Sequence, residues 1–343
     1  MKTALLHYWL TNVRGGEKVL AALGELMPEA DVFAHAYLPR SFGESSRERL
    51  WGHRASESFI ARLPLGRRHP QAYLPLMPAA TRALQLDGYD LIVSSESGPI
   101  KGIRKPKGAR HVCYCHTPMR YLWDMHDEYY RSAGLIGKLS MKLFTSYLRR
   151  EDLKSAESVD EFVANSAFVA ERIKRIYGRD SVVVHPPVEV EFFSAAERTA
   201  GDYYLFVGAP VAYKRLDLAE EACRRMGRRL VVAGGGAATD EELRWLYAGA
   251  KALLFPGLED FGIVPVEAQA AGCPVIAYGA GGALETVRDG ETGVFFGRQD
   301  VESLCGAMEE CEGRSWNPDA CRANARRFSK QVFLNRMKGV LGC

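Results

Sequence analysis

The stretch from Ala252 to Gly272, which reads ALLFPGLEDFGIVPVEAQAAG, constrains the fold more than any other part of the chain. Its opening residues form a short apolar run that is typical of a fully buried strand, and Pro256 with Gly257 interrupts this run. Pro265 suits a first helical turn, and Gly272 suits a helix end. The sequence therefore predicts a strand, a loop and a helix, which is the unit that builds an open parallel sheet.

Two acidic residues punctuate this stretch. Glu259 follows the strand, Glu267 lies on the first turns of the helix, and seven residues separate them. Either acid alone could serve only to complement the helix dipole, which is worth up to about 1 kcal/mol. Between them, Phe261 and Gly262 allow bare backbone to approach a bound group. Because ligands of open parallel sheets bind outside the carboxyl ends of the strands, the loop is predicted to face a ligand.

The motif EDFGIVPVEAQAAG, flanked by ALLFP, CPVIAYG, GGALETV and TGVFF, resembles the donor-site signature of retaining glycosyltransferases of family 4. The resemblance covers nearly the whole chain. It implies an α/β fold of the GT-B type, with two Rossmann-like domains that face a central cleft. It also implies that Glu259 meets the hydroxyls of the transferred sugar and that Glu267 binds the nucleotide ribose. The backbone expected beside the sugar phosphate is that of Phe261, Gly262, Ile263 and Val264.

The length of 343 residues exceeds what a single core usually supports, so two domains are expected. The polar stretch ERTAGD favours a boundary near Arg198. This places an N-terminal Rossmann-like acceptor domain at 1–198 and a C-terminal nucleotide-sugar donor domain at 199–318. Residues 319–343 contain a predicted long helix, Asp319 to Val340, and in relatives such a helix packs back toward the N-terminal domain.

Charge and cysteine usage exclude several classes. The chain has 45 Lys and Arg against 42 Asp and Glu, and this near balance does not favour a nucleic-acid partner. Eight scattered cysteines without metal-ligand spacing favour buried thiols in a reducing cytosol. No apolar run reaches the ~20 residues of a membrane span, and no signal peptide is recognised. We expect a cytoplasmic protein that needs no metal or other cofactor and takes a nucleotide sugar as substrate.

Gly15 and Gly16 join a predicted strand, Thr3 to Tyr8, to a predicted helix, Arg14 to Met27. A glycine pair at this point either makes a tight turn or lets backbone N–H groups face an anion at the helix start. The residues alone do not separate these interpretations. The family resemblance implies that Gly16 faces the donor diphosphate.

His116 and Ser166 are the other candidates in this half. His116 ends the predicted strand from His111 and opens the segment HTPMRYLWD. A histidine on an apolar strand is usually a core residue, but the strand end and the resemblance place His116 beside the transferred sugar. Ser166 stands in the N-cap position of NSAFVAERIKRIYG. Capping alone would explain Ser166, and the resemblance adds a contact with the active cleft.

Lys214 and Arg215 lie at the start of a predicted helix, Tyr213 to Met226, which follows a predicted strand, Tyr203 to Val207. Basic side chains there suit a phosphate. The family carries a lysine at the position of Lys214 for the diphosphate. Many members have an arginine where this chain has Ala209, and Arg215 is the candidate to replace it.

The donor domain departs from the family between strand Leu230 to Ala233 and helix Thr239 to Tyr247, which only GGGAA separates. Relatives usually insert a helix and a strand here, and this unit helps to hold the nucleobase. Without it, the sheet order 3-2-1-4-5-6 would become 2-1-4-5-6, with the helix crossing back to Ala252 to Phe255. We therefore expect weak base recognition.

The segment from Gly134 to Ser158 has apolar residues at helical spacing with basic residues between them. One interpretation is a core helix with a solvated face, and the sequence slightly favours it. The other is a basic amphipathic helix that lies on an anionic membrane. The apolar positions are Leu135, Leu139, Leu143, Tyr147 and Leu148, and the basic ones are Lys138, Lys142, Arg149, Arg150 and Lys154.

The resemblance implies a retaining transferase that moves a hexose, specifically mannose from GDP-mannose, to a glycan or lipid-linked saccharide in polysaccharide synthesis. It would work in the cytoplasm, with possible peripheral contact at the inner face of the cell membrane. Two alternatives stay open. One is a catalytically silent nucleotide-sugar or glycan-binding protein, suggested by Ala209 and the missing unit. The other is a nucleotide-sugar 2-epimerase of the same fold, which the spacing of the two acids disfavours.

Overall fold

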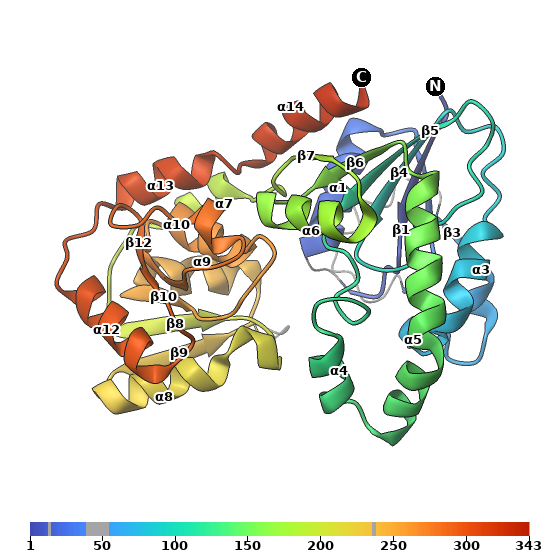
Figure 1. The fold of residues 1–343 in the computed structure, drawn as a ribbon. Helices are drawn as coiled ribbons and strands as arrows, with labels where there is room; N and C mark the ends of the chain where they lie inside the picture. Colours follow the sequence, from blue (N-terminus) through green and yellow to red (C-terminus); the bar gives the residue numbers. More distant parts are fainter. Residues whose placement is uncertain (13–14, 39–54, 235–237, 343) are drawn as a thin grey trace. The chain divides into compact units, whose positions relative to one another are not determined.

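The computed structural model describes residues 1–12, 15–38, 55–234 and 238–342 (Figure 1). The chain divides into two compact units. The first contains Met1–Val184 and Arg336–Cys343, and the second contains His185–Asn335. Each unit is an α/β structure built on one parallel sheet, as the sequence predicts.

The first sheet has seven strands in the order β3-β2-β1-β4-β5-β6-β7, and every neighbouring pair is parallel. Strand order reverses between β1 and β4, which makes this point the place where a doubly wound sheet binds ligands. Strands β1 and β4 are buried along their whole length because helices cover both faces of such a sheet. The strands are β1 (Thr3–His7), β2 (Asp31–Ala34), β3 (Ala55–Glu57), β4 (Leu91–Glu96), β5 (Arg110–Cys115), β6 (Glu161–Ala164) and β7 (Ser181–Val183).

The first unit contains two short helices whose bounds the sequence did not predict, α3 (Met77–Arg82), in a region where helical pieces are expected, and α4 (His126–Ser132). Both are short, so hydrophobic periodicity gives little signal for them. The prolines at 64, 70, 75 and 78 predict an irregular region with helical pieces over 40–86, of which 40–54 lie outside the described residues. The remaining helices are α1 (Gly15–Leu26), α5 (Leu135–Ser155), α6 (Ala167–Tyr177) and the end of α14 (Lys330–Leu341).

Helix α5 is not the core helix that its pattern favours. Of its residues only Leu148 and Asp152 are buried. Leu135 and Ile136 at its start are 89% and 87% exposed, and Leu139, Leu143 and Phe144 are exposed as well. The apolar stripe of its first half thus faces away from the core of its unit. None of the helices in the described ranges has both the length and the apolar character that crossing a membrane demands.

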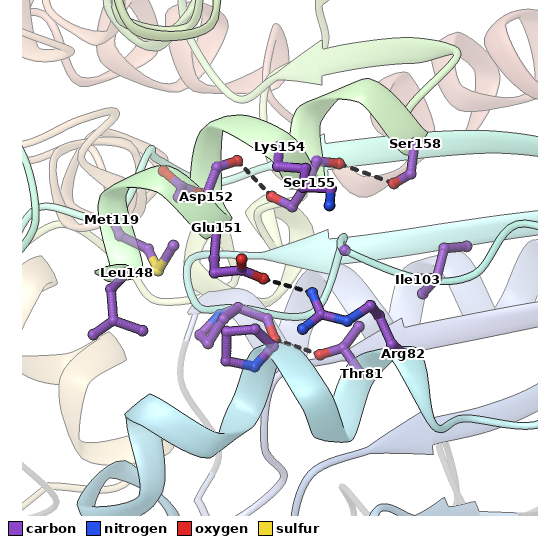
Figure 2. Close-up of a pocket in the computed structure, with 13 residues that line it drawn as sticks. Thr81, Arg82, Ile103, Met119, Leu148, Glu151, Asp152, Lys154, Ser155 and Ser158 are labelled. Carbon is purple, nitrogen blue, oxygen red and sulfur yellow. Dashed lines mark hydrogen bonds and ion pairs between the residues drawn. The ribbon is translucent and has the colours of Figure 1, made fainter. Parts of the chain in front are cut away.

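A small pocket of about 100 Å³ lies between α3 and α5 (Figure 2). Several of its polar lining groups are bonded to each other. Arg82 and Glu151 form an ion pair of 2.6 Å, and the Thr81 hydroxyl donates to the Pro99 carbonyl at 2.8 Å. These bonds already occupy the polar groups of Arg82, Glu151 and Thr81, so they do not converge on a ligand.

The second sheet has five strands in the order β12-β11-β10-β8-β9. This is the predicted order 2-1-4-5-6 read from the opposite edge, so the absence of one βα unit is confirmed in the described chain. Strand β9 forms an edge, and α9 (Asp240–Gly249) leads from it to β10. The strands are β8 (Tyr203–Val207), β9 (Arg229–Ala233), β10 (Ala252–Phe255), β11 (Val275–Tyr278) and β12 (Gly293–Phe296).

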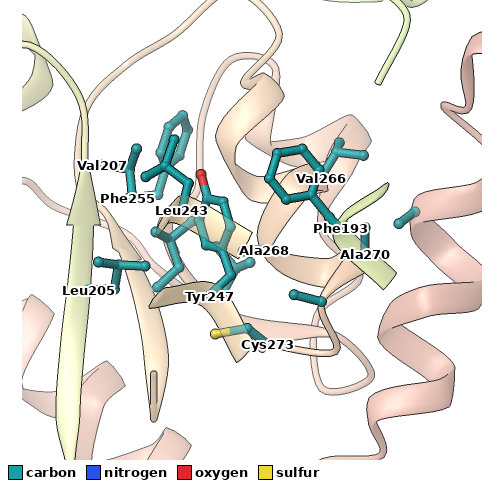
Figure 3. Close-up of a cluster of buried hydrophobic side chains, with 14 of the residues drawn as sticks. Phe193, Leu205, Val207, Leu243, Tyr247, Phe255, Val266, Ala268, Ala270 and Cys273 are labelled. Atoms are coloured by element: carbon teal, nitrogen blue, oxygen red, sulfur yellow. The ribbon is translucent and has the colours of Figure 1, made fainter. Parts of the chain in front are cut away.

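The core of the second unit fills the space between this sheet and α9, α10 (Ile263–Ala270) and α13 (Pro318–Arg326) (Figure 3). Leu205, Leu253 and Val275 come from adjacent strands, and Tyr247 and Val266 come from the helices. The unit's other helices are α7 (Val190–Ser194), α8 (Leu216–Met226), α11 (Ala283–Thr286) and α12 (Val301–Glu312). Six of the seven described cysteines are buried, as expected for thiols that pack in the core.

Two predicted boundaries are wrong. The units divide after Val184, not near Arg198, because Val188 and Phe193 belong to the core of the second unit. The expected long C-terminal helix is broken into α13 and α14, and Phe328 is buried in the second core at the break. The expectation that the chain ends on the first unit is confirmed, since Arg110 donates to the carbonyls of Val340 and Leu341 at 2.7 and 3.1 Å.

Candidate functional site

Three side chains meet at the carboxyl edge of the first sheet. His7 ends β1, Ser95 lies near the end of β4, and His116 follows β5 directly. The Ser95 Oγ lies 3.2 Å from His7 Nδ1 and 2.8 Å from His116 Nε2. The His116 N–H donates to the Glu96 carbonyl at 2.8 Å, which continues the ladder between β4 and β5. The predicted candidate His116 is therefore held at the switch point of the sheet.

Gly16 brings the start of α1 against this group. A Cβ on Gly16 would lie 3.2 Å from Tyr8 Oη, 3.4 Å from His7 Cε1 and 3.5 Å from His116 Nε2. A Cβ here would be tight against Tyr8 Oη and in van der Waals contact with the two rings, so the start of α1 approaches this group closely. The first turn of α1 presents unpaired backbone N–H groups, which suits the expected contact with a diphosphate. That contact itself stays a prediction.

The His116 ring is neutral at physiological pH. Burial, with a further effect from His7, lowers the pKa of His116 to about 3. The ring therefore acts through hydrogen bonds and not as a fixed cation. One of its nitrogens can donate and the other can accept.

Ser166 is an N-cap, as its position predicts. Its Oγ accepts from the Val169 N–H at 3.0 Å and donates to Asn165 Oδ1 at 3.1 Å. The residue is fully buried. Capping accounts for this serine, and its contact with a donor stays a prediction.

Lys214 and Glu259 meet at the corresponding edge of the second sheet. They follow β8 and β10, the two strands between which the order of this sheet reverses. Lys214 Nζ lies 3.0 Å from Glu259 Oε1, and the two side chains are 17% and 18% exposed. A Cβ on Gly208 would lie 2.8 Å from Lys214 Cδ, and one on Gly257 would lie 2.8 Å from Lys214 Cα. Glycines thus let both loops close around the lysine.

The loop before α10 is fixed by packing. The Phe261 side chain is buried, with its ring 5.4 Å from that of His185 and 5.5 Å from that of Phe328. Gly262 precedes the helix with a φ of 86°, a conformation that favours glycine. Because the Phe261 ring points into the core, Phe261 and Gly262 offer their backbone at the end of this loop. Ile263 and Val264 in the first turn are half-buried, so that turn stays reachable.

Glu267 is hydrogen-bonded to Tyr247, a residue that the sequence analysis did not identify as part of the site. The Tyr247 hydroxyl on α9 donates to Glu267 Oε2 at 3.0 Å, and both residues are buried. Burial, with the nearby Glu267 charge, raises the pKa of Tyr247 well above its usual range, so the hydroxyl remains a donor. The shortened connection from β9 to β10 is what places α9 at this position.

Arg215, the candidate to replace the arginine expected at Ala209, is bonded to other residues of its own unit, and its phosphate contact stays a prediction. Helix α8 begins at Leu216, not at Tyr213, because Arg215 has a φ of 56° and separates it from a short 3-10 turn. The guanidinium pairs with Asp217 at 3.1 Å and donates to the Gln299 carbonyl at 3.3 Å. A phosphate contact from Arg215 would require these bonds to break.

Family comparisons agree with this geometry. The model described as "Glycosyltransferase Family 4" matches residues 13–192, which is more than half of the chain. The chain belongs to glycosyltransferase family 4. The model "Glycosyl transferases group 1" matches residues 235–328 of the second unit. This match begins directly after β9, where the family 4 chain lacks its βα unit.

Curated relatives are matched over part of their length. The D-inositol 3-phosphate glycosyltransferase of Mycobacterium avium (strain 104) is 29% identical over 195 residues, which is 44% of this chain and 46% of that protein. The protein of the same name from Mycobacterium tuberculosis (strain F11) is 28% identical over 196 residues, 45% and 41% of the two chains. The match thus spans less than half of these relatives.

Solved structures share the whole fold. Sucrose-phosphate synthase from Thermosynechococcus elongatus has a TM-score of 0.73 at 16% identity, covering 99% of this chain and 98% of that one. Anabaena HepE, solved in complex with UDP, has a TM-score of 0.68 at 16% identity and is covered completely, as is this chain. These likenesses establish the GT-B fold for this family 4 chain.

Sequence reasoning missed His7, Ser95 and Tyr247 as parts of the site. His7 and Ser95 read as ordinary positions of buried strands, and Tyr247 reads as a core position of α9. The only available signal was that His7 and Ser95 lie at the carboxyl ends of their strands, as His116 does.

Changing Tyr247 to Phe tests the support of Glu267. We expect the variant to weaken nucleotide binding about three- to tenfold and to lower the free energy of unfolding by about 1 kcal/mol, because Glu267 loses a hydrogen bond. Calorimetric titration and urea unfolding measure the two effects. Tyr203→Phe is the matched control, since its hydroxyl donates to the Leu246 carbonyl at 2.8 Å, away from Glu267. Equal nucleotide affinity in both variants would contradict the supporting role.

Proposed function

We propose that this protein is a retaining hexosyltransferase that moves a sugar from a nucleotide sugar to a glycan or lipid-linked acceptor. The observation that carries the proposal is the Lys214–Glu259 pair of 3.0 Å beside the N-terminus of α10. This arrangement combines a fixed cation, a carboxylate and free backbone N–H groups at a switch point. Such a set suits a substrate with a diphosphate next to a polyhydroxylated ring.

In the reaction, the bond from the anomeric carbon to the diphosphate oxygen breaks and a bond to an acceptor oxygen forms. Negative charge grows on the departing diphosphate, and Lys214 with the α10 N-terminus stabilises it. Glu259 accepts hydrogen bonds from the sugar hydroxyls, and Glu267 accepts from the ribose. Neutral His116 orients a reacting group through a hydrogen bond. These roles rest on the family likeness and on the position of each residue at its strand end.

The donor we propose to test first is GDP-mannose, on the basis of the subfamily-like segment HTPMRYLWD. The comparisons add other candidates. Structural neighbours were solved with UDP and UDP-glucose, and the matched relatives are named for D-inositol 3-phosphate. A donor panel should therefore contain GDP-mannose and UDP-glucose, and an acceptor panel should contain D-inositol 3-phosphate beside lipid-linked saccharides.

The test is turnover by the purified full chain. Sugar release or transfer from any donor supports a transferase. Nucleotide binding without any turnover would favour the silent binding protein instead, and conversion of a nucleotide sugar to its 2-epimer would favour the epimerase.

Nucleotide selectivity is expected to be poor. Because β9 is an edge strand and the following βα unit is absent, the unit that relatives use to flank the base is missing. A site that does not hydrogen-bond a base edge cannot reject a different base strongly. We expect GDP and UDP to bind weakly and within about tenfold of each other, a gap near 1.4 kcal/mol. Tight GDP binding with undetectable UDP binding in calorimetry would contradict this expectation.

We also propose that α5 contacts an anionic membrane. The first half of α5 exposes Leu135, Ile136, Leu139 and Leu143. Lys142 and Arg150 are exposed beside them, and the acidic residues of α5 are confined to its last turns. Apolar side chains among cations, without acids, match a helix that lies in a lipid interface. Arg149 takes no part, because it donates to the Leu122 carbonyl at 2.6 Å.

Sedimentation with anionic vesicles tests this surface. Burial of one leucine side chain contributes ~1.5–3 kcal/mol, so exchanging Leu139 and Leu143 for serine should weaken binding at least tenfold. High salt should weaken it as well, because each surface cation contributes ~1 kcal/mol. The control is Leu284→Ser, an exposed leucine of the second unit. Absence of wild-type binding at low salt would reject the membrane proposal.

A further inference from the structure

We propose that Glu17, His7 and Ser95 form a relay that fixes which ring nitrogen of His116 carries the proton. Glu17 faces His7 across 3.7 Å, and hydrogen bonds join His7, Ser95 and His116. In this arrangement His116 is protonated on Nε2 and presents Nδ1 as an acceptor. The inference rests on the proposed function for its catalytic meaning, but the protonation pattern can be measured without any turnover. His7, Ser95 and Glu17 are positioning residues, since they act through His116.

The relay is built from groups that are shielded from water. His7 and Ser95 are fully buried, and Glu17 is 2% exposed. His7 Nε2 lies 3.7 Å from Glu17 Oε1, His7 Nδ1 lies 3.2 Å from Ser95 Oγ, and Ser95 Oγ lies 2.8 Å from His116 Nε2. Within the described part of the chain, His7 Nε2 is a buried nitrogen without a hydrogen-bond partner. The nearest carboxylate is thus the group that this nitrogen faces.

The direction of each bond follows from the carboxylate. The carboxylate oxygens of Glu17 accept, and the place of this residue in the first turn of α1 favours negative charge there. A single ring proton on His7 therefore lies on Nε2, toward Glu17, and Nδ1 is left as an acceptor. A serine hydroxyl has a single proton, which Ser95 then donates to His7 Nδ1. Ser95 Oγ is left to accept from His116, which places the His116 proton on Nε2.

Apart from Glu17, the described residues that pack against the two rings are uncharged. The His7 ring packs on Tyr8 with centroids 4.2 Å apart, and the His116 ring packs edge-on against Tyr114 at 5.2 Å. Gly16 covers the Nε2 side of His116 from α1. The Tyr114 hydroxyl is already committed, since it donates to the Val184 carbonyl at 2.8 Å. The carboxylate of Glu17 is thus the charged group that decides the direction of the relay.

A fixed tautomer has a catalytic use under the proposed function. Nδ1 as an obligatory acceptor can take a hydrogen bond from a sugar or acceptor hydroxyl, which orients that hydroxyl. The other tautomer would present an N–H donor at the same place and would repel a hydroxyl proton. The relay therefore selects one of two His116 tautomers, which have the same shape but offer opposite hydrogen-bonding groups to a bound hydroxyl.

The test is nitrogen NMR of the histidine-labelled full chain, which distinguishes protonated from bare ring nitrogens. We expect His116 to be protonated on Nε2 in the wild type. Glu17→Gln removes the acceptor-only group, because an amide can also donate. We expect this variant to shift His116 partly or wholly toward the Nδ1-protonated form. A wild-type His116 protonated on Nδ1, or a Glu17→Gln variant with an unchanged tautomer, would overturn the inference.

Strand β4 offers a matched control for the kinetic readout. Ser94 lies on the opposite face from Ser95 and makes an equivalent buried bond of 2.9 Å to His111 Nε2. Ser95→Ala should lower kcat about tenfold with little change in KM, and Ser95→Thr, which keeps the hydroxyl, should recover part of it. Ser94→Ala should leave kcat unchanged. Equal kcat losses in the two alanine variants would show a structural role only, and a protein inactive on every donor leaves the NMR test intact.

Discussion

Changing Glu259 to Gln is expected to lower kcat/KM for sugar transfer about a hundredfold. The amide has the same size but no charge, so the hydrogen bonds to the sugar hydroxyls lose their charge assistance. Lys214, 3.0 Å away, also loses its counter-charge before the donor binds. A hydrogen bond to a charged group is worth ~1.5–3 kcal/mol, which is roughly ten- to 150-fold in rate. Initial rates over a range of donor concentrations measure the effect.

Glu312→Gln is the control for this change. Glu312 is as exposed as Glu259, at 19% against 18%, and it pairs with Arg228 and Lys251 in the same unit. Burial opposes ionisation there, but hydrogen bonds and ion pairs, that with Arg228 above all, lower the pKa of Glu312 to about 2. The variant should therefore lose stability while its transfer rate is unchanged. Wild-type kcat/KM in Glu259→Gln would remove this residue from the reaction.

Much of the fold was predictable because parallel sheets give strong sequence signals. Strands such as β8, β10 and β12 are short apolar runs bounded by glycine or proline, and these features fix their ends. The order of the second sheet followed from counting βα units and from the right-handed crossover rule. The predicted strand ends, together with the family resemblance, indicated His116 and Lys214 as candidates.

The features that the sequence did not predict correctly depend on contacts between residues that are far apart in the sequence. The pairing of His7 with Ser95 joins residues 88 positions apart, and no local pattern indicates it. The interpretation of α5 failed because helical periodicity shows that a stripe is apolar but not whether another element covers it. The domain boundary failed because Val188 and Phe193 lie before the polar linker signal yet pack into the second core.

Replacing Lys101 by Met is expected to lower the free energy of unfolding by about 3–5 kcal/mol. Lys101 is fully buried, and its Nζ lies 2.5 Å from both Glu96 Oε1 and Asp152 Oδ1. Burial alone would lower the pKa of Lys101, but the carboxylates of Asp152 and Glu96 hold it well above its usual range. Removing the cation leaves two carboxylates buried together without compensation, which is the costly case. Urea unfolding followed by tryptophan fluorescence and circular dichroism measures the change.

Lys105→Met is the control, because it removes a lysine charge from an ion pair that is exposed to solvent. Lys105 pairs with Asp160 at the same distance of 2.5 Å, but the side chains are 29% and 41% exposed. An exposed pair contributes about 0–1 kcal/mol, so this variant should unfold close to the wild-type midpoint. Similar midpoints for the two lysine variants would contradict the role given to burial.

The triple variant Lys101→Met, Glu96→Gln and Asp152→Asn tests the cause of this loss. It separates the effect of losing the cation from the cost of leaving two buried carboxylates without a counter-charge. Removing all three charges should recover a large part of the loss, because a neutral cluster of similar volume avoids the desolvation cost. The site provides a second readout. The Glu96 carbonyl accepts the His116 N–H, while the Glu96 carboxylate accepts the Lys101 N–H at 2.6 Å. If the cluster holds the end of β4 in place, Lys101→Met should broaden the His116 NMR signals even in the absence of denaturant, and the triple variant should sharpen them again.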